Sequence, residues 1–215
     1  MKHVEVTHNL SLIYEALKTN KAAWDKFDTE IKALKATDSA GSNKKVLWDI
    51  TVQQAQVYAV IVLLTNSMIE ALANCYLAEK CDQEQFEALE RLNTLDKLVV
   101  VPKLLIKEYE FPKGEALYCD LKHLLTLRKS IVHPKPRIIV NGQTIHKGNL
   151  AKKVSTSTLT PDKCISLPVR LVEHLCLYDH GGAFGLCIYS GFSKKVTEGI
   201  ILKVRAKSLK QRTAK

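Results

Sequence analysis

The chain has 215 residues, of which 46% are hydrophobic and 25% are charged, and this balance is typical of a water-soluble protein with one sizeable core. Its longest apolar run, residues 59–64, is too short to cross a bilayer, and the first ten residues lack the apolar core of a signal peptide. The six cysteines form no C-x-x-C pair, and no glycine-rich phosphate loop occurs. We therefore expect a cytoplasmic protein with no membrane segment, metal site, disulfide framework or nucleotide-hydrolysing fold.

The positive charge is unevenly distributed. The net charge is +10, and residues 121–160 contain no Asp or Glu at all. The basic residues of that stretch are Lys122, Arg128, Lys129, Lys135, Arg137, Lys147, Lys152 and Lys153. A second basic segment, residues 194–215, closes the chain, and it can equally be a solvated tail. The acid-free stretch favours a polyanionic partner over an acidic metabolite.

Most of the chain has helical periodicity. Residues 10–18 and 22–34 show helical spacing, and residues 38–43 break it. A long central helix is predicted over residues 45–79, apolar nearly all round in its middle, as the buried axis of a bundle. Shorter helices are expected at 83–91, from Thr94, and after Pro102, followed by one from Gly114 to about Val132. The tryptophans, Trp24 and Trp48, are interpreted as core anchors rather than platforms for base stacking.

The character of the sequence changes after the last of these helices. Asn141 and Gly142 stand between two short β-branched runs, which is the strongest local pattern for a tight hairpin. Residues 149–163 read as a polar loop, residues 168–178 as a helix, and residues 179–191 as either a broken helix or a close packing segment. We thus expect one domain over 1–192, with N-terminal helices 1–40, bundle core 45–133, hairpin and loop 137–163 and C-terminal helices 165–190. Residues 193–215 are expected to form a basic tail.

Arg128 has an unusual place in the helix that ends near Val132. At about 100° per residue it falls near the centre of an apolar arc, rather than at its edge. The arc consists of Leu117, Leu121, Leu124, Leu125, Ile131 and Val132. An unpaired buried guanidinium costs several kcal/mol, so Arg128 needs an anion beside it. That anion is either an internal carboxylate, such as Glu70, or the phosphate of a ligand.

His133 follows Arg128 by five residues, about 140° further round the helix. Pro134 disfavours helical geometry at His133, which places this histidine where the chain turns away from the helix. A histidine there can bond the last free carbonyls of the helix or face solvent. The spacing alone does not choose between the two roles.

Three segments together resemble the HEPN superfamily, a helical-bundle group of prokaryotic toxins, defence proteins and RNA-processing ribonucleases. They are "LLTNSMIEALANCYL", "LNTLDKLVVVPKLL" and "DLKHLLTLRKSIVHPKP". The resemblance covers roughly residues 46–136, and its defining motif is R-x(4 to 6)-H at the end of a long helix. Arg128 and His133 match this motif with four residues between them.

The resemblance implies an all-α, HEPN-like antiparallel bundle, here with a small β-hairpin insertion after the helix that carries the motif. It implies a homodimer in which the arginines and histidines of two chains line one cleft. The implied reaction is metal-independent and cofactor-free RNA cleavage, with 2′-OH attack on phosphorus and a 2′,3′-cyclic phosphate product. His133 would act as general acid or base, and Arg128 would stabilise the charge on the phosphoryl oxygens. The setting would be a toxin–antitoxin pair, with a cognate antitoxin protein, or phage defence.

This chain departs from the family pattern directly after the arginine. Many active members have a small polar residue there, often Asn, whereas this chain has Lys129, a supporting residue that can contact phosphate as a point charge but cannot accept a hydrogen bond. Glu70 and Asn74 are nominated as further supporting groups. The basic residues Lys135, Arg137, Lys147, Lys152 and Lys153 are expected to contact an RNA backbone. The alternatives are a non-catalytic module that binds nucleic acid or a partner protein, and a structural protein in which an internal carboxylate pairs with Arg128.

Overall fold

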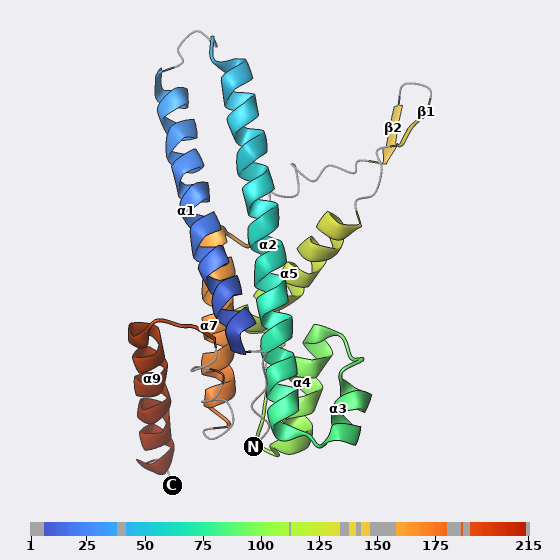
Figure 1. The fold of residues 1–215 in the computed structure, drawn as a ribbon, viewed down its shortest axis with the longest axis vertical. Coiled ribbons are helices and arrows are strands. Elements are labelled where there is room, and N and C mark those ends of the chain that lie inside the picture. Colours follow the sequence, from blue (N-terminus) through green and yellow to red (C-terminus); the bar gives the residue numbers. More distant parts are fainter. Residues whose placement is uncertain are drawn as a thin grey trace.

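The structure, a computed structural model, describes residues 7–37, 42–111, 113–133, 138–140, 143–146, 158–179, 186 and 190–213. It is an all-α bundle, as predicted (Figure 1). The helices are α1 (Thr7–Thr37), α2 (Lys44–Lys80), α3 (Gln83–Leu89), α4 (Thr94–Leu105), α5 (Ala116–Val132), α7 (Pro161–Cys176) and α9 (Lys194–Thr213). Two short strands, β1 (Ile138–Val140) and β2 (Gln143–His146), lie between α5 and α7 in the chain.

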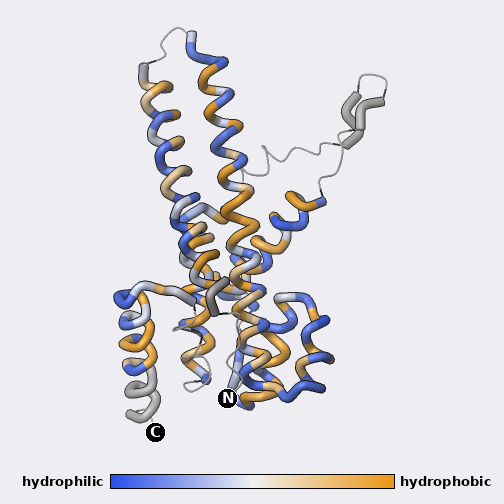
Figure 2. Tube along the Cα trace, viewed as in Figure 1, coloured by the Kyte–Doolittle hydropathy of each residue, from blue (hydrophilic) through white to orange (hydrophobic). Residues whose placement is uncertain are grey.

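Helix α2 is the axis of the bundle, as the sequence predicts. Figure 2 shows that its central turns are predominantly hydrophobic. Its buried residues include Ile61, Met68, Leu72 and Tyr76, and they join one core with residues of α1, α4, α5, α7 and α9. By length and composition α2 is also the one described helix apolar enough to cross a membrane, but 56% of its most apolar window is buried inside the fold. A core helix has the same composition, so the absence of a membrane segment stays a prediction.

Helices α1 and α2 form a long antiparallel pair whose far ends extend beyond the other helices (Figure 1). The two helical patterns predicted for residues 10–34 are one continuous helix. Trp24 packs partly buried against Tyr58, with ring centroids 5.5 Å apart, and is a core anchor as predicted. Trp48 is 66% exposed near the start of α2, so its prediction as a core anchor is wrong. The reason is that no other described helix reaches this end of the pair.

Helices α3 and α4 begin with clear N-caps. The Asp82 carboxylate accepts from the Gln85 backbone N–H in a capping box, and Asn93 accepts from the N–H of Asp96. The predicted break at Pro102 is wrong, because α4 continues through it to Leu105. Proline leaves the carbonyl four residues earlier, that of Leu98, without its helical donor. The Tyr109 hydroxyl donates to this carbonyl at 2.9 Å and replaces the missing bond.

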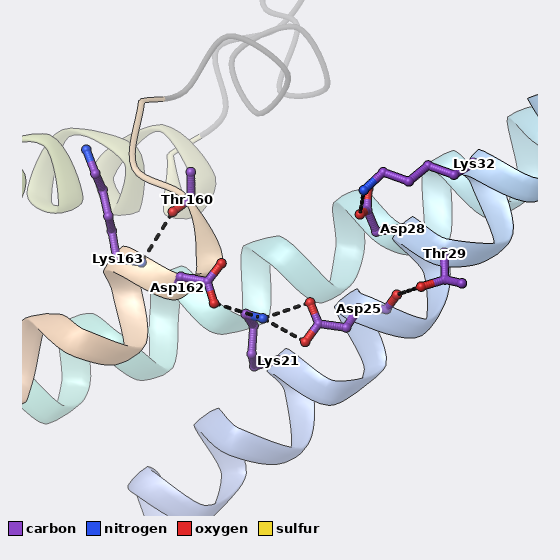
Figure 3. A network of polar contacts seen from close by, with 8 residues as sticks. All are labelled: Lys21, Asp25, Asp28, Thr29, Lys32, Thr160, Asp162 and Lys163. Atoms are coloured by element: carbon purple, nitrogen blue, oxygen red, sulfur yellow. Dashed lines mark hydrogen bonds and ion pairs between the residues drawn. The ribbon is translucent and has the colours of Figure 1, made fainter. Parts of the chain in front are cut away.

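Helix α7 starts earlier than predicted, inside the stretch interpreted as a loop. Thr160 is its N-cap and accepts from the Lys163 N–H, and Pro161 occupies the first turn. Figure 3 shows how this end is attached to α1: Lys21 lies between Asp25 of α1 and Asp162 of α7, at 2.6 and 2.9 Å. The first turn of α7 is therefore held by a cap and an ion pair.

The basic C-terminal segment is helix α9, so the prediction of a tail is wrong. Ile200 and Val204, four residues apart, are buried in the core, and Lys203 pairs with Glu173 of α7 at 3.0 Å. The chain reaches α9 through Gly191, whose φ is +65°. A Cβ at Gly191 would clash with the Cβ and Cα of Ser11, which supports close packing at this end of the glycine-rich segment.

Strands β1 and β2 pair antiparallel, with Val140 opposite Gln143 and a register shift between Ile138 and Ile139. Asn141 and Gly142, the predicted turn, lie outside the described residues. The pair follows α5 in the chain and lies away from the bundle (Figure 1). Its interpretation as the insertion of an HEPN-like fold stays a prediction.

Candidate functional site

The candidate site is the C-terminal end of α5. The helix ends at Val132, and His133 is its C-cap with φ −121° and ψ 69°, a non-helical geometry that Pro134 predicts. The buried residues of α5, however, stop at Leu127: they are Leu117, Asp120, Leu121, Leu124 and Leu127. Figure 1 shows that this end of α5 projects away from α2. The last turn is therefore less covered by the bundle than the turns before it.

Arg128 lies within the apolar arc but is half-buried rather than buried. The predicted arc is correct for Leu117, Leu121 and Leu124, whereas Val132 is 43% exposed and Leu125 and Ile131 are half-buried. Among the described residues, no carboxylate lies within ion-pair distance of the Arg128 guanidinium. Glu70, the internal partner considered from the sequence, is exposed on α2. The described residues therefore do not provide the internal carboxylate that a purely structural role of Arg128 requires.

His133 is exposed at the end of the helix. Its backbone N–H donates to the Lys129 carbonyl at 3.0 Å and closes the last helical turn. Its imidazole makes no hydrogen bond to any residue that the structure describes, so the capping role considered from the sequence is not observed there. Arg128 and His133 leave the helix in different directions, in keeping with the 140° between them. No residue that the structure describes occupies either side chain through an ion pair or a side-chain hydrogen bond.

The supporting residues are divided between different parts of the fold. Lys129 is exposed, one residue from Arg128, and belongs to the same helix end. Asn74 lies on α2, and its amide oxygen accepts from Lys97 of α4 at 2.8 Å. Lys97 is only 5% exposed, so this bond satisfies a buried ammonium and links α2 to α4. Asn74 therefore has a structural role in the described fold.

The five basic residues predicted to contact RNA all lie outside the described residues. They are Lys135, Arg137, Lys147, Lys152 and Lys153. Their role stays a prediction. Across the residues that the structure covers, no group of three or more His, Cys, Asp and Glu side chains is arranged to hold a metal ion.

An ion-pair cluster in the first half of α5 was missed from the sequence. Asp120 is buried and receives Arg170 of α7 at 2.7 Å, with Lys163 at 3.8 Å. Asp120 and Arg170 are fifty residues apart, so no local pattern joins them. Close by, the thiol of Cys164 in α7 is buried and interacts with the Thr65 hydroxyl of α2. Its pKa is raised to about 12, mainly by burial and in part by the negative charge of Asp120, while the Thr65 hydroxyl opposes the shift.

A second feature that sequence reasoning missed is a groove of about 490 Å³ where α5 begins. It is lined by Glu115, Ala116, Leu117, Arg170, Glu173, His174, Leu177 and Lys203. His174 also packs edge-on against Tyr109 and Phe111, with ring centroids 5.6 and 4.8 Å apart. The two cationic side chains of the groove, Arg170 and Lys203, are paired with Asp120 and Glu173. This groove lies at the opposite end of α5 from Arg128 and His133.

Comparison with known proteins gives no match: no family model, no curated protein and no solved structure is similar to this chain. The fold shown is an all-α helical bundle, and the resemblance to the HEPN superfamily remains a prediction from the sequence.

Proposed function

We propose that this chain is a metal-independent endoribonuclease of the HEPN type, with Arg128 and His133 as its catalytic residues. One observation supports the proposal above the others. The end of α5 carries a half-buried arginine and an exposed histidine whose side chains have no partner among the described residues. The described part of the fold pairs the buried Asp120 with two cations but provides no ion pair or side-chain hydrogen bond for these two groups. Groups without a structural role at a helix end are candidates for binding and catalysis.

The chemistry needs a base, an acid and a stabiliser of negative charge. In the proposed reaction a His133 imidazole accepts the proton of the ribose 2′-OH, and the 2′ oxygen bonds to the adjacent phosphorus. The bond from phosphorus to the 5′ oxygen breaks, and a second imidazole, His133 of the other chain of a homodimer, gives that oxygen a proton. The Arg128 guanidinium stabilises the charge on the non-bridging oxygens. The products are a 2′,3′-cyclic phosphate and a 5′-OH, and the use of the 2′-OH restricts the reaction to RNA.

The proposal includes a cellular role. A cytoplasmic ribonuclease of this kind acts as a toxin, restrained by a cognate antitoxin protein, or as a phage-defence factor. The net charge of +10 favours an RNA substrate.

A second candidate function is a non-catalytic HEPN-like module that binds nucleic acid or a partner protein. Lys129 favours it, because the position after Arg128 cannot accept a hydrogen bond. Cleavage separates the two candidates, since a binding module retains RNA affinity without producing cyclic phosphate ends.

The test is cleavage of labelled single-stranded and structured RNA in EDTA, with analysis of the product ends. The native chain is compared with Arg128→Ala and His133→Ala. Two matched controls are Arg91→Ala, an exposed arginine after α3, and His123→Ala, on the same helix as the candidate site. We expect cyclic phosphate ends from the native chain and both controls, and at least a hundredfold slower cleavage by the two site variants. Equal cleavage by all five proteins would reject the proposed catalytic pair.

A further inference from the structure

Five exposed residues of α5 and its C-cap form one row along the helix, and the exposed Ala116 and Val132 lie off this row. The five are Cys119, Lys122, Thr126, Lys129 and His133, at successive steps of three, four, three and four residues. This spacing places all five on one face of the helix. The stripe therefore leads along α5 directly to His133.

The stripe is positively charged and has no acid to neutralise it. Lys122 and Lys129 form no ion pair with any described residue, and α5 contains no Asp or Glu beyond Asp120, which is buried and already paired. Two lysines elsewhere in the fold do have carboxylate partners: Lys80 pairs with Asp179 at 2.7 Å and Lys203 with Glu173 at 3.0 Å. Lys129 gains from the helix dipole in the last turn, but Lys122, nearly three turns from that end, does not. The helix itself thus gives no reason for a cation at Lys122.

We propose that this stripe is the track along which single-stranded RNA lies, with Lys122 and Lys129 contacting phosphates about three nucleotides apart on the way to His133. The inference rests on the proposed function and adds its substrate class and footprint. From Lys122 to His133 the helix rises about 16 Å. One stacked strand advances about 3.4 Å per nucleotide, so the track holds about five nucleotides.

The geometry favours a single strand over a duplex. The stripe holds its two lysines in one row along α5, and such a row can follow one phosphate backbone at a time. The major groove of A-form RNA is too deep and narrow for side chains to read, and its wide minor groove calls for a broader contact surface. In-line attack by the 2′-OH also needs a nucleotide that can leave helical geometry, which an unpaired strand provides.

Binding is measured separately from cleavage, with a fluorescent oligoribonucleotide of roughly twelve nucleotides whose 2′-O-methyl groups prevent reaction. The native chain, Lys122→Gln and Lys129→Gln are titrated at several salt concentrations. Each variant is expected to reduce the slope of log affinity against log salt by about 0.7, which is about fivefold in affinity near 0.1 M salt. The matched control is Lys26→Gln, an exposed lysine of α1, which is expected to bind as the native chain does.

Two results would overturn the track: slopes of both stripe variants equal to the native slope, or tighter binding of a duplex of the same length. The same proteins are then assayed for cleavage of ordinary RNA. Cleavage that depends on Arg128 and His133, with native slopes in the lysine variants, rejects the track and leaves the ribonuclease. Reduced slopes without any cleavage by the native chain keep the track as an RNA-binding surface and reject the ribonuclease.

Discussion

Each half of α5 has one charged residue on its less exposed side, Asp120 in the first half and Arg128 in the second, and the described fold pairs only Asp120. In the first half, the buried Asp120 is surrounded by Arg170 and Lys163. In the second half, the described fold provides no partner for the side chains of Arg128, Lys129 or His133. Paired charges hold α5 against α7, whereas unpaired ones contribute nothing of that kind to folding. The contrast locates the candidate site at the end of α5 more directly than burial or charge alone.

Pairing also determines whether a charged residue stabilises or destabilises the folded state. A guanidinium half withdrawn from water costs free energy when no anion lies beside it, so Arg128, which has no carboxylate partner among the described residues, should destabilise the folded state. Functional sites often retain such groups at the expense of stability. Removing a paired charge should therefore lower the free energy of unfolding markedly, and removing an unpaired charge should not.

The largest loss of stability is expected when the paired residue Asp120 is replaced. Asp120→Ala leaves Arg170 without its closest partner, and we expect the free energy of unfolding to fall by about 3 kcal/mol, at the lower end for a buried pair because Arg170 keeps some solvent contact. Urea denaturation monitored by circular dichroism measures it. Asp162→Ala is the control, since this exposed carboxylate pairs with Lys21 at the surface and should cost less than about 1 kcal/mol. Equal losses in the two variants would contradict the comparison.

The neighbourhood of Asp120 also predicts a pH dependence. Because the pKa of the folded Cys164 thiol is raised from 9.0 to about 12, this thiol stabilises the fold fully below pH 9, and that contribution is lost as the pH rises towards 12. By about pH 10.5 the loss is roughly 2 kcal/mol. Cys164→Ala removes the titrating group, so its stability should fall less steeply over this window. Parallel curves for the native chain and the variant would show that Cys164 does not titrate in this way.

Much of the fold could be predicted from the sequence where a local pattern determined it. The hydrophobic repeat of residues 45–79 predicted α2 to within one residue at each end, because burial follows that repeat directly. The break at Pro102 was predicted wrongly because the hydroxyl that replaces the lost hydrogen bond comes from Tyr109, outside the helix. The start of α7 was missed although Thr160 and Pro161 are good N-terminal residues, since the polar composition before them suggested a loop.

The candidate site could be predicted only in part. Helix periodicity placed Arg128 on the apolar arc, and Pro134 correctly predicted that the helix stops before His133. The sequence could not show that the arc is uncovered at its end, because that depends on where α5 lies relative to α2. Nor could it show which charges are paired, since Asp120 and Arg170 meet only through tertiary packing.

A smaller loss of stability is expected when the N-cap of α7 is removed. Thr160→Ala removes the acceptor of the Lys163 N–H and should cost about 1 kcal/mol. Thr29→Ala is the matched control, because the Thr29 hydroxyl donates to the Asp25 carbonyl within α1 and caps nothing (Figure 3). Since alanine is the better helix former, that variant should be as stable as the native chain or slightly more stable. Thermal unfolding of the two variants side by side measures the difference, and an equal loss in both would argue against the cap.

The smallest expected change in stability tests the comparison most sharply. Arg128→Met keeps an unbranched aliphatic stem against the apolar arc and removes the charge. With no ion pair to lose and a desolvation cost relieved, the free energy of unfolding should stay within about 0.5 kcal/mol of the native value or rise. Cleavage of RNA should nevertheless disappear, so that stability and activity change independently. A loss of stability comparable to that of Asp120→Ala would mean that the guanidinium holds the fold together, and the two halves of α5 would then be alike.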